Sequence, residues 1–330
     1  MSTPAFWQHK GVAARLLSPL GAAVGWVTAL RVARPGWRAP VPVICCGNAG
    51  VGGTGKTTLV LDLVARLQHR ELLVHCLTRG YGGTARGPLL VDPLRHGAEL
   101  VGDEPLLLAA VAPTWVGGDR AASARLAVGA GAQVLLMDDG LQNPALVQDA
   151  ALLVIDGAVG FGNGMVVPAG PLRESVARAA ARCRAAVLIG ADQAGAERQL
   201  PGTLTILRAG LVPERRMHGR RVVAFAGIGR PGKFYETLEA AGATVTETMD
   251  FADHHVFTDE EINALVARAF ELQATPVTTP KDAARLGGRL HPAMETVGVR
   301  LAWENQIDLE SLLDTVVGPG SRGSRAATVQ

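Results

Sequence analysis

The amino-terminal part of the chain contains no acidic residue, and the first carboxylate is that of Asp62. The first forty residues carry five basic side chains, namely Lys10, Arg15, Arg31, Arg34 and Arg38. Over all 330 residues the net charge is only +2, so the chain as a whole is not a polyanion-binding surface and nucleic acid is not an expected partner. The positive charge is a local property of the amino terminus.

No hydrophobic run is long enough to span a membrane as a helix. The run Leu16–Leu30 would extend about 22 Å, less than the roughly 30 Å of the hydrocarbon core, and no secretory cleavage site follows it. Ser18 and Pro19 suit the N-cap and first turn of such a helix. Because Arg15 and Arg31 flank the run, we expect a helix in the membrane interface that faces anionic lipid. The alternative is the buried first helix of a soluble domain.

Paired cysteines are absent as well. The four cysteines, Cys45, Cys46, Cys76 and Cys183, form no C-x-x-C pair and have no metal-ligand spacing. Three of them lie in apolar runs that are typical of strands. We therefore expect small buried side chains in a reducing compartment, without a disulfide framework.

Charged residues make up only 19% of the chain and hydrophobic residues 48%, which excludes a disordered protein. The length suggests two domains, with a boundary where Pro213, Arg215 and Arg216 interrupt the pattern. The expected division is a membrane-associating helix at 1–40, a nucleotide-binding domain at 41–212, a smaller α/β domain at 213–317 and a disordered tail at 318–330.

After Pro40, short continuous apolar runs alternate with helical stretches, which predicts a parallel sheet with helices on both faces. The expected strands are 41–46, 72–77, 114–116, 133–137, 151–155 and 185–189, and the expected helices are 56–69, 104–111 and 120–129. A second set begins near Arg221, with strands at 222–226, 244–249, 276–279 and 297–303 and helices at 232–241 and 259–272. Thr258 and Glu261 form the capping box of the last helix.

The strongest motif is the P-loop Gly50–Thr57, which follows an expected strand and opens an expected helix. Its glycines let backbone N–H groups approach the phosphates of a nucleoside triphosphate. Lys56 is placed to reach the terminal phosphates, and the Thr57 hydroxyl to bind Mg²⁺. Asp138 and Asp139 directly follow another expected strand, where P-loop proteins carry a second acid for Mg²⁺.

These two motifs leave the reaction open. No Asn-Lys-x-Asp tetrad is present, which argues against a GTPase, and Val51 stands where ATPases of the ParA/MinD type carry a signature lysine. Phosphoryl transfer to a hydroxyl needs a base, and Asp103 and His254 are candidates that could equally be a helix cap and a solvated loop residue. Gly227–Gly232 matches a dinucleotide-binding pattern, although a domain turn explains it more simply.

Further motifs follow in order along the chain. They are Gly47-Asn48, Thr78–Gly82, Gly102–Pro105, Asp138–Gln142, Pro168–Glu174, Gly227–Gly229, Phe251–His255 and Thr278–Ala283. With the hydrophobic amino-terminal helix and the P-loop they cover almost the whole chain. In this combination the sequence resembles the tetraacyldisaccharide 4′-kinase family of lipid A biosynthesis.

The resemblance implies a fold of two α/β/α domains with the active site between them, at the cytoplasmic face of the bacterial inner membrane. It implies transfer of the γ-phosphoryl group of ATP, with Mg²⁺, to the 4′-hydroxyl of the lipid A disaccharide 1-phosphate, which gives lipid IVA. The implied partners are this lipid and the anionic membrane surface, and no protein partner is implied. A membrane-associated regulatory ATPase of the ParA/MinD type and a kinase of a soluble metabolite remain as alternatives.

The resemblance also implies roles for individual residues. Asp103 would be the catalytic base, acting with His254 from the other domain. Arg79, Tyr81 and Arg173 would contact phosphate or sugar. Thr57, Asp138 and Asp139 would serve Mg²⁺, and the nucleotide phosphates would be held by Gly50, Gly52, Gly53, Thr54, Gly55, Lys56, Thr57 and Thr58.

Two positions depart from the family's pattern. Thr58 stands where a proline often follows the P-loop threonine, which a helix tolerates. Asn143 follows Gln142 where many members have histidine, so no role of that ring carries over to this chain.

Overall fold

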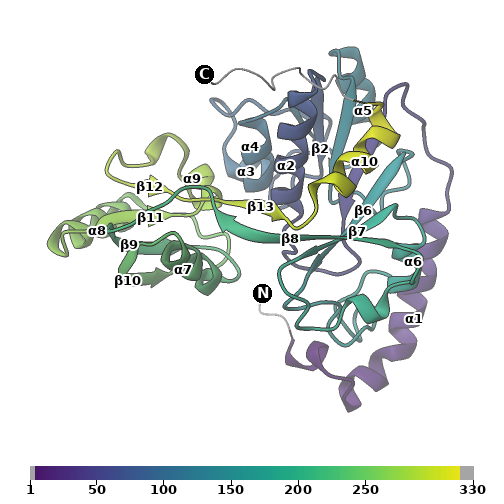
Figure 1. Ribbon diagram of the computed structural model, residues 1–330, viewed down its shortest axis with the longest axis horizontal. Helices are drawn as coiled ribbons and strands as arrows, with labels where there is room; N and C mark the ends of the chain where they lie inside the picture. Colours follow the sequence, from purple (N-terminus) through teal and green to yellow (C-terminus); the bar gives the residue numbers. More distant parts are fainter. Residues whose placement is uncertain (1–3, 320–330) are drawn as a thin grey trace, which may run out of the picture.

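The computed structural model describes residues 4–319, which form two α/β units of unequal size connected by a pair of strands (Figure 1). The expected tail at 318–330 lies outside the described residues except for its first two positions.

The larger unit is built on a nine-stranded sheet with the order β13-β8-β7-β6-β1-β5-β2-β4-β3. Its strands are β1 (Val43–Gly47), β2 (Val74–Thr78), β3 (Leu89–Leu90), β4 (Thr114–Val116), β5 (Val134–Asp138), β6 (Ala150–Asp156), β7 (Ala185–Ile189), β8 (Thr205–Pro213) and β13 (Val299–Trp303). Neighbouring strands are parallel except for the outer pairs β3–β4 and β8–β13. Every residue of β1, β2, β5, β6 and β7 is buried, which explains their continuous apolar sequences.

Helices cover both faces of this sheet. One face packs against α2 (Lys56–His69), α4 (Asp103–Ala109) and α10 (Gln306–Val317), and the other against α5 (Arg120–Gly129) and α6 (Val176–Ala180). Because side chains alternate along a strand, Ile44 and Cys46 of β1 join the first core and Val43 and Cys45 join the second. The short α3 (Ala98–Val101) lies just before α4.

The smaller unit has four parallel strands in the order β10-β9-β11-β12. They are β9 (Arg221–Ala226), β10 (Thr244–Asp250), β11 (Thr275–Thr278) and β12 (Glu295–Thr296), and the helices are α7 (Pro231–Ala240), α8 (Asp259–Glu271) and α9 (Pro280–Leu286). Phe234 and Leu238 of α7 pack on one face of the sheet, and Ile262 of α8 with Leu286 of α9 pack on the other. The structure thus confirms the expected fold class, a parallel sheet with helices on both faces plus a smaller α/β unit.

Several helices and strands begin and end at the predicted residues, among them β7, α2 and α5. The capping box is also confirmed, since Thr258 Oγ1 accepts from Glu261 N at 3.2 Å and Glu261 Oε2 accepts from Thr258 N at 2.8 Å. The strand β8 was not expected; only Leu207 and Ala209 of its nine residues are buried, so it lacks the continuous burial of the inner strands.

The expected extent of the smaller domain, 213–317, does not match the topology. β13 pairs with β8 in the sheet of the larger unit, with Trp303 opposite Ala209. After it, α10 places Leu309 and Leu313 in the core under α2. Arg66 of α2 and Arg70, the residue that follows α2, form ion pairs with acids of α10 that hold the helix there, namely Arg66–Glu310, Arg70–Glu310 and Arg70–Asp314. The chain therefore leaves the larger unit and returns to it.

The amino-terminal helix is longer than its apolar run suggests. After a short 3-10 turn, η1 (Ala5–Gln8), α1 covers Val12–Val32, so Ser18 is not its N-cap and Pro19 lies in its interior. Pro19 is exposed and, because it has no backbone N–H, removes one hydrogen bond from the interior of the helix. A helix of 21 residues extends about 31 Å, so the expectation that it is too short to cross a membrane was wrong. Length and composition alone allow a crossing.

The cysteines are free, and Cys45, Cys46 and Cys76 are buried in strands as expected. Burial raises the pKa of each of these thiols, and that of Cys76 reaches about 12. They act as small core side chains.

We predict that Thr258→Ala lowers the free energy of unfolding by about 1 kcal/mol, because the first turn of α8 loses its capping oxygen. Urea denaturation followed by circular dichroism measures the change. Thr258→Ser keeps the hydroxyl and is the control. Equal stability of the alanine variant and the wild type would contradict the capping role.

Candidate functional site

The P-loop connects β1 to α2 at the carboxyl edge of the larger sheet. Gly52 and Gly55 have φ values of +113° and +87°, which side chains with a Cβ rarely adopt. No side chain caps the start of α2 at Gly55, so the first N–H groups of the helix are available to an anion. Within residues 4–319, the buried Thr54 Oγ1 has no hydrogen-bond partner. The loop has the shape and the free donors of a phosphate site.

Asp138 ends β5, directly beside β1, where it is paired in register with Cys46. The Thr57 hydroxyl donates to Asp138 Oδ2 at 3.2 Å, and the buried Oδ1 has no partner among the described residues. Burial and the nearby Glu104 raise the pKa of Asp138 to about 7 against the opposing effect of Lys56. A buried acid with an unpaired oxygen next to a hydroxyl fits a Mg²⁺ site, since Mg²⁺ in nucleotide sites takes few protein oxygens beside the phosphates.

Asp139 is surrounded by cations. Arg173 donates two hydrogen bonds of 3.0 Å from Nη1 and Nη2 to its Oδ2, and Lys56 Nζ lies 3.7 Å from its Oδ1. Burial raises the pKa of Asp139, but Lys56 and Arg173 outweigh this effect and hold it below its usual value. Its φ of +55° directs the chain sharply away from β5. Asp139 thus connects the P-loop lysine to Arg173, one of the expected substrate contacts.

A further group of polar residues holds the Arg173 segment against the P-loop. The backbone N–H of Val51 donates to Pro171 O, and that of Arg173 to Ala49 O. The fully buried Glu174 accepts from Gln142 at 2.9 Å and pairs with Arg182 at 2.6 Å. The sequence motifs contain Gln142 and Glu174 but give them no role; their part in fixing Arg173 emerges only from the fold.

Asp103 is the first residue of α4, and its carboxylate contacts two side chains of the smaller unit. Arg285 donates to its Oδ2 at 2.6 Å, and His254 Nδ1 lies 3.4 Å from the same oxygen. Burial raises the pKa of Asp103, but Lys281, Arg285 and His254 together lower it below its usual value. The expected partnership of Asp103 and His254 across the two units is thus present as a contact.

Arg285 lies outside every motif that was recognised in the sequence. Its side chain is buried, and it also donates to Gly227 O at 2.6 Å and to Asp282 Oδ1 at 2.7 Å. Next to it, Lys281 pairs with Glu104 of α4 at 2.7 Å. The motif Thr278–Ala283 contains Lys281 but not its partner, because the partner lies 177 residues away in the chain.

The remaining expected contacts, Arg79 and Tyr81, lie in the loop after β2. Tyr81 is exposed, and its ring centroid is 6.2 Å from that of His254. The loop lies against Gly102, because a Cβ there would come within 2.5 Å of Tyr81 O. The buried Arg120 lies near Arg79. Burial lowers the pKa of Arg120 to about 10, and its Nε has no hydrogen-bond partner among the described residues. No motif in the sequence indicated a role for Arg120.

Comparison with known proteins gives consistent matches. A family model described as tetraacyldisaccharide-1-P 4′-kinase matches residues 13–318. The tetraacyldisaccharide 4′-kinase of Gluconacetobacter diazotrophicus is 54% identical over 319 residues, which is 95% of this chain and 98% of the relative. That of Rhodospirillum centenum is 52% identical over 323 residues, 95% of this chain and 96% of the relative.

Among solved structures, LpxK from Aquifex aeolicus in complex with ATP matches with a TM-score of 0.74 and 26% sequence identity. The match covers 92% of this chain and 99% of that chain. Fold and sequence therefore agree over nearly the whole length.

We predict that Arg285→Met lowers the free energy of unfolding at neutral pH by about 3 kcal/mol, because it leaves Asp103 as a buried charge without its main partner. Asp103 has a depressed pKa in the folded state, so its ionised form stabilises the fold above the unfolded value near 3.9. That contribution disappears as the pH falls through the folded pKa, and the cost of the substitution should shrink with it.

Urea denaturation at neutral pH and at about pH 3 measures this dependence. Arg289→Met is the matched control, because Arg289 makes an exposed ion pair with Asp259 at 3.3 Å that is worth under about 1 kcal/mol. A cost for Arg285→Met that does not change with pH would contradict the ionic role.

Proposed function

The chain belongs to the tetraacyldisaccharide-1-P 4′-kinase family, and from that membership we propose how its own residues phosphorylate the 4′ position of a lipid A precursor. The phosphoryl donor is ATP, and the acceptor is the 4′-hydroxyl of the tetraacyldisaccharide 1-phosphate. The observation that carries the residue assignment is the contact between Asp103 of the larger unit and His254 of the smaller unit.

The P-loop residues are proposed to bind ATP. The backbone of Gly50–Thr57 surrounds the phosphates, and Lys56 neutralises their charge. The uncapped start of α2 favours the binding of such an anion. Thr58, in the first turn of α2, continues this site. When bound, Mg²⁺ compensates the charge of the phosphates. Its ligands are proposed to be the Thr57 hydroxyl and Asp138, because Asp138 Oδ1 is buried and unpaired in the described part of the chain. Asp139, already paired with Lys56 and Arg173, is proposed as the second acid of the site.

Asp103 is proposed to accept the proton of the 4′-hydroxyl. A sugar hydroxyl is a weak nucleophile, and a carboxylate that takes its proton strengthens it as the new bond forms. The cations around Asp103 keep it ionised and therefore able to accept. His254 orients this carboxylate, while Arg79, Tyr81 and Arg173 border the space where phosphate and sugar groups of the substrate would lie.

The exposed side of α1 supports a position at the membrane. Small residues turn toward the protein, with Ala14 and Gly21 buried and Gly25 against Val166. Large apolar residues turn outward, namely Val12, Leu16, Leu20, Val24, Trp26, Val27 and Leu30. An apolar surface of this extent on a soluble protein is unusual and is typical of a lipid-facing helix. Arg15, Arg31 and Arg34 are exposed near its two ends, where they can meet anionic headgroups.

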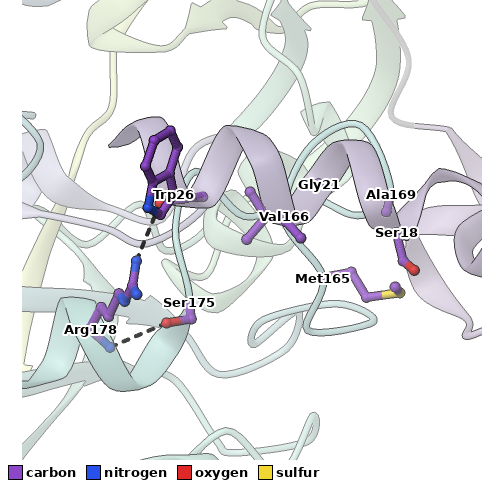
Figure 2. Close-up of a pocket in the computed structure, with 10 residues that line it drawn as sticks. Ser18, Gly21, Trp26, Met165, Val166, Ala169, Ser175 and Arg178 are labelled. Carbon is purple, nitrogen blue, oxygen red and sulfur yellow. Dashed lines mark hydrogen bonds between the residues drawn. The ribbon is translucent and has the colours of Figure 1, made fainter. Parts of the chain in front are cut away.

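A groove lies beside α1, against the segment that also carries Arg173. It has a volume of about 400 Å³ between α1 and the segment 165–178, and Figure 2 shows Val166 in its middle and Arg178 at one end. The same segment carries Arg173 on Asp139. At the carboxyl end of α1, Arg31 reaches Gln142 O at 3.5 Å. These features support our proposal that the protein acts at the cytoplasmic face of the inner membrane, with the acyl chains of its substrate near α1.

The test of the reaction is incubation with γ-labelled ATP and the tetraacyldisaccharide 1-phosphate, followed by detection of labelled lipid. We predict no detectable transfer by Lys56→Ala or Asp138→Ala. Asp103→Asn should reduce turnover roughly 10²- to 10⁴-fold with little change in ATP affinity, because Asp103 lies outside the P-loop.

Normal turnover of Asp103→Asn would refute the base assignment. ATP hydrolysis at the same rate without lipid would instead favour a regulatory ATPase. Transfer to a soluble sugar in preference to the lipid would favour a kinase of a soluble metabolite.

For the membrane, we predict that the double variant Leu20→Glu, Val27→Glu no longer sediments with vesicles that contain phosphatidylglycerol, because charges on the outer side of α1 oppose insertion. Phe270→Glu is the matched control, since Phe270 is equally apolar and 85% exposed but lies on α8 of the smaller unit. Equal sedimentation of the double variant and the wild type would contradict the role of α1.

A further inference from the structure

The segment Gly227–Gly232 of the smaller unit meets the P-loop of the larger unit through one side chain, that of Arg230. Its Nη2 donates to the backbone carbonyl oxygen of Gly53 at 3.3 Å and to the carboxylate of Asp156. Gly53 belongs to the P-loop, so a guanidinium group from one unit touches the phosphate-binding loop of the other.

Asp156 holds the guanidinium of Arg230 beside the P-loop. It ends β6, the strand beside β1, so its carboxylate reaches the same edge of the sheet as the P-loop. Its side chain is almost fully buried and is contacted by Arg230 and by Lys233 Nζ at 3.0 Å. Burial raises the pKa of Asp156, but the hydrogen bonds from Arg230 and Lys233 outweigh this effect and lower it.

The surroundings of Arg230 favour an anion. The N–H groups of a P-loop converge on phosphates, and Thr54, next to Gly53, has a buried hydroxyl without a partner in residues 4–319. Within the described part of the chain both contacts of Arg230 use Nη2, which leaves its other donors there for an oxyanion in the paired geometry that arginine prefers. Since 43% of the side chain is exposed, the guanidinium is accessible to an anion that binds at the P-loop.

We propose that Arg230 is a phosphate contact of the ATP site that the smaller unit contributes, and that Asp156 holds its guanidinium beside the P-loop until ATP takes it. The inference rests on ATP as the donor in the proposed function. It assigns to the smaller unit a direct part in binding the nucleotide, in addition to His254 at the acceptor side.

Lys233 provides the comparison that separates this role from a structural one. It pairs with the same carboxylate from the same helix start, and among the described residues it contacts Asp156 and not the P-loop. If the ion pairs only connect the two units, the loss of either cation has a similar effect. If Arg230 contacts phosphate, only its loss weakens ATP binding strongly.

The experiment is calorimetric titration of the full-length protein with Mg²⁺ and ATP, for Arg230→Ala, Lys233→Ala, Asp156→Asn and the double variant Arg230→Ala, Asp156→Asn. Thermal unfolding of each variant checks that it is folded. We expect Arg230→Ala to weaken ATP binding roughly 10- to 100-fold, the size of a lost charge-assisted hydrogen bond. Lys233→Ala should change the affinity less than about threefold, since among the described residues Lys233 contacts Asp156 and not the P-loop.

The variants of Asp156 provide the sharpest result. Asp156→Asn should bind ATP at least as tightly as the wild type, because the guanidinium no longer has a competing carboxylate. The double variant should stay as weak as Arg230→Ala. Wild-type affinity in the double variant would show that Arg230 only neutralises Asp156, and equal losses for Arg230→Ala and Lys233→Ala would show a structural ion pair; either result overturns the proposal.

Because ATP binding is measured without the lipid, this test is independent of the acceptor. If the wild type does not label the tetraacyldisaccharide but Arg230→Ala weakens ATP binding, the proposed function is refuted and the role of Arg230 is supported. If the wild type labels the lipid and Arg230→Ala binds ATP with unchanged affinity, the proposed function is supported and the role of Arg230 is refuted.

Discussion

The site depends on one constraint, that the strands around β1 are parallel and end at the same edge of the sheet. The P-loop follows β1, Asp138 ends β5 and Asp156 ends β6, and these three strands are neighbours. Loops far apart in sequence thereby deliver donors, acids and cations to one place. The hydrophobic cores on both faces of the sheet hold these strand ends in register, so the geometry of the polar groups depends on apolar packing beneath them.

Opposite charges organise the meeting of the two units. The larger unit presents acids, Asp103, Glu104 and Asp156, and the smaller unit presents cations to each of them. Buried pairs of this kind add little net stability, because desolvation offsets their attraction. They do define which surfaces face each other, and they bring His254 to Asp103. The interface is thus specified mainly by charge placement.

Local signals in the sequence predicted the local structure. The P-loop and α2 were found from the glycine pattern and the helical period, and the capping box from Thr258 and Glu261. Signals that depend on distant partners were missed: the pairing of β13 with β8, and the contact of Arg285 with Asp103 across 182 residues. The start of α1 was predicted wrongly, because Pro19 was assigned to the first turn of the helix and lies in its interior. The family resemblance supplied the Asp103–His254 pair, which no periodicity reveals.

The return of the chain through β13 makes the smaller unit an insertion into the larger one. Its entry strand β8 and its exit strand β13 pair antiparallel, with Arg300 opposite Val212, and Figure 1 shows both running from one unit to the other. A hydrogen-bonded pair of strands bends across its flat face far more easily than within its plane. Motion of the smaller unit is therefore restricted to a hinge with one main axis, and every approach of Arg230 and His254 to the larger unit follows the same arc.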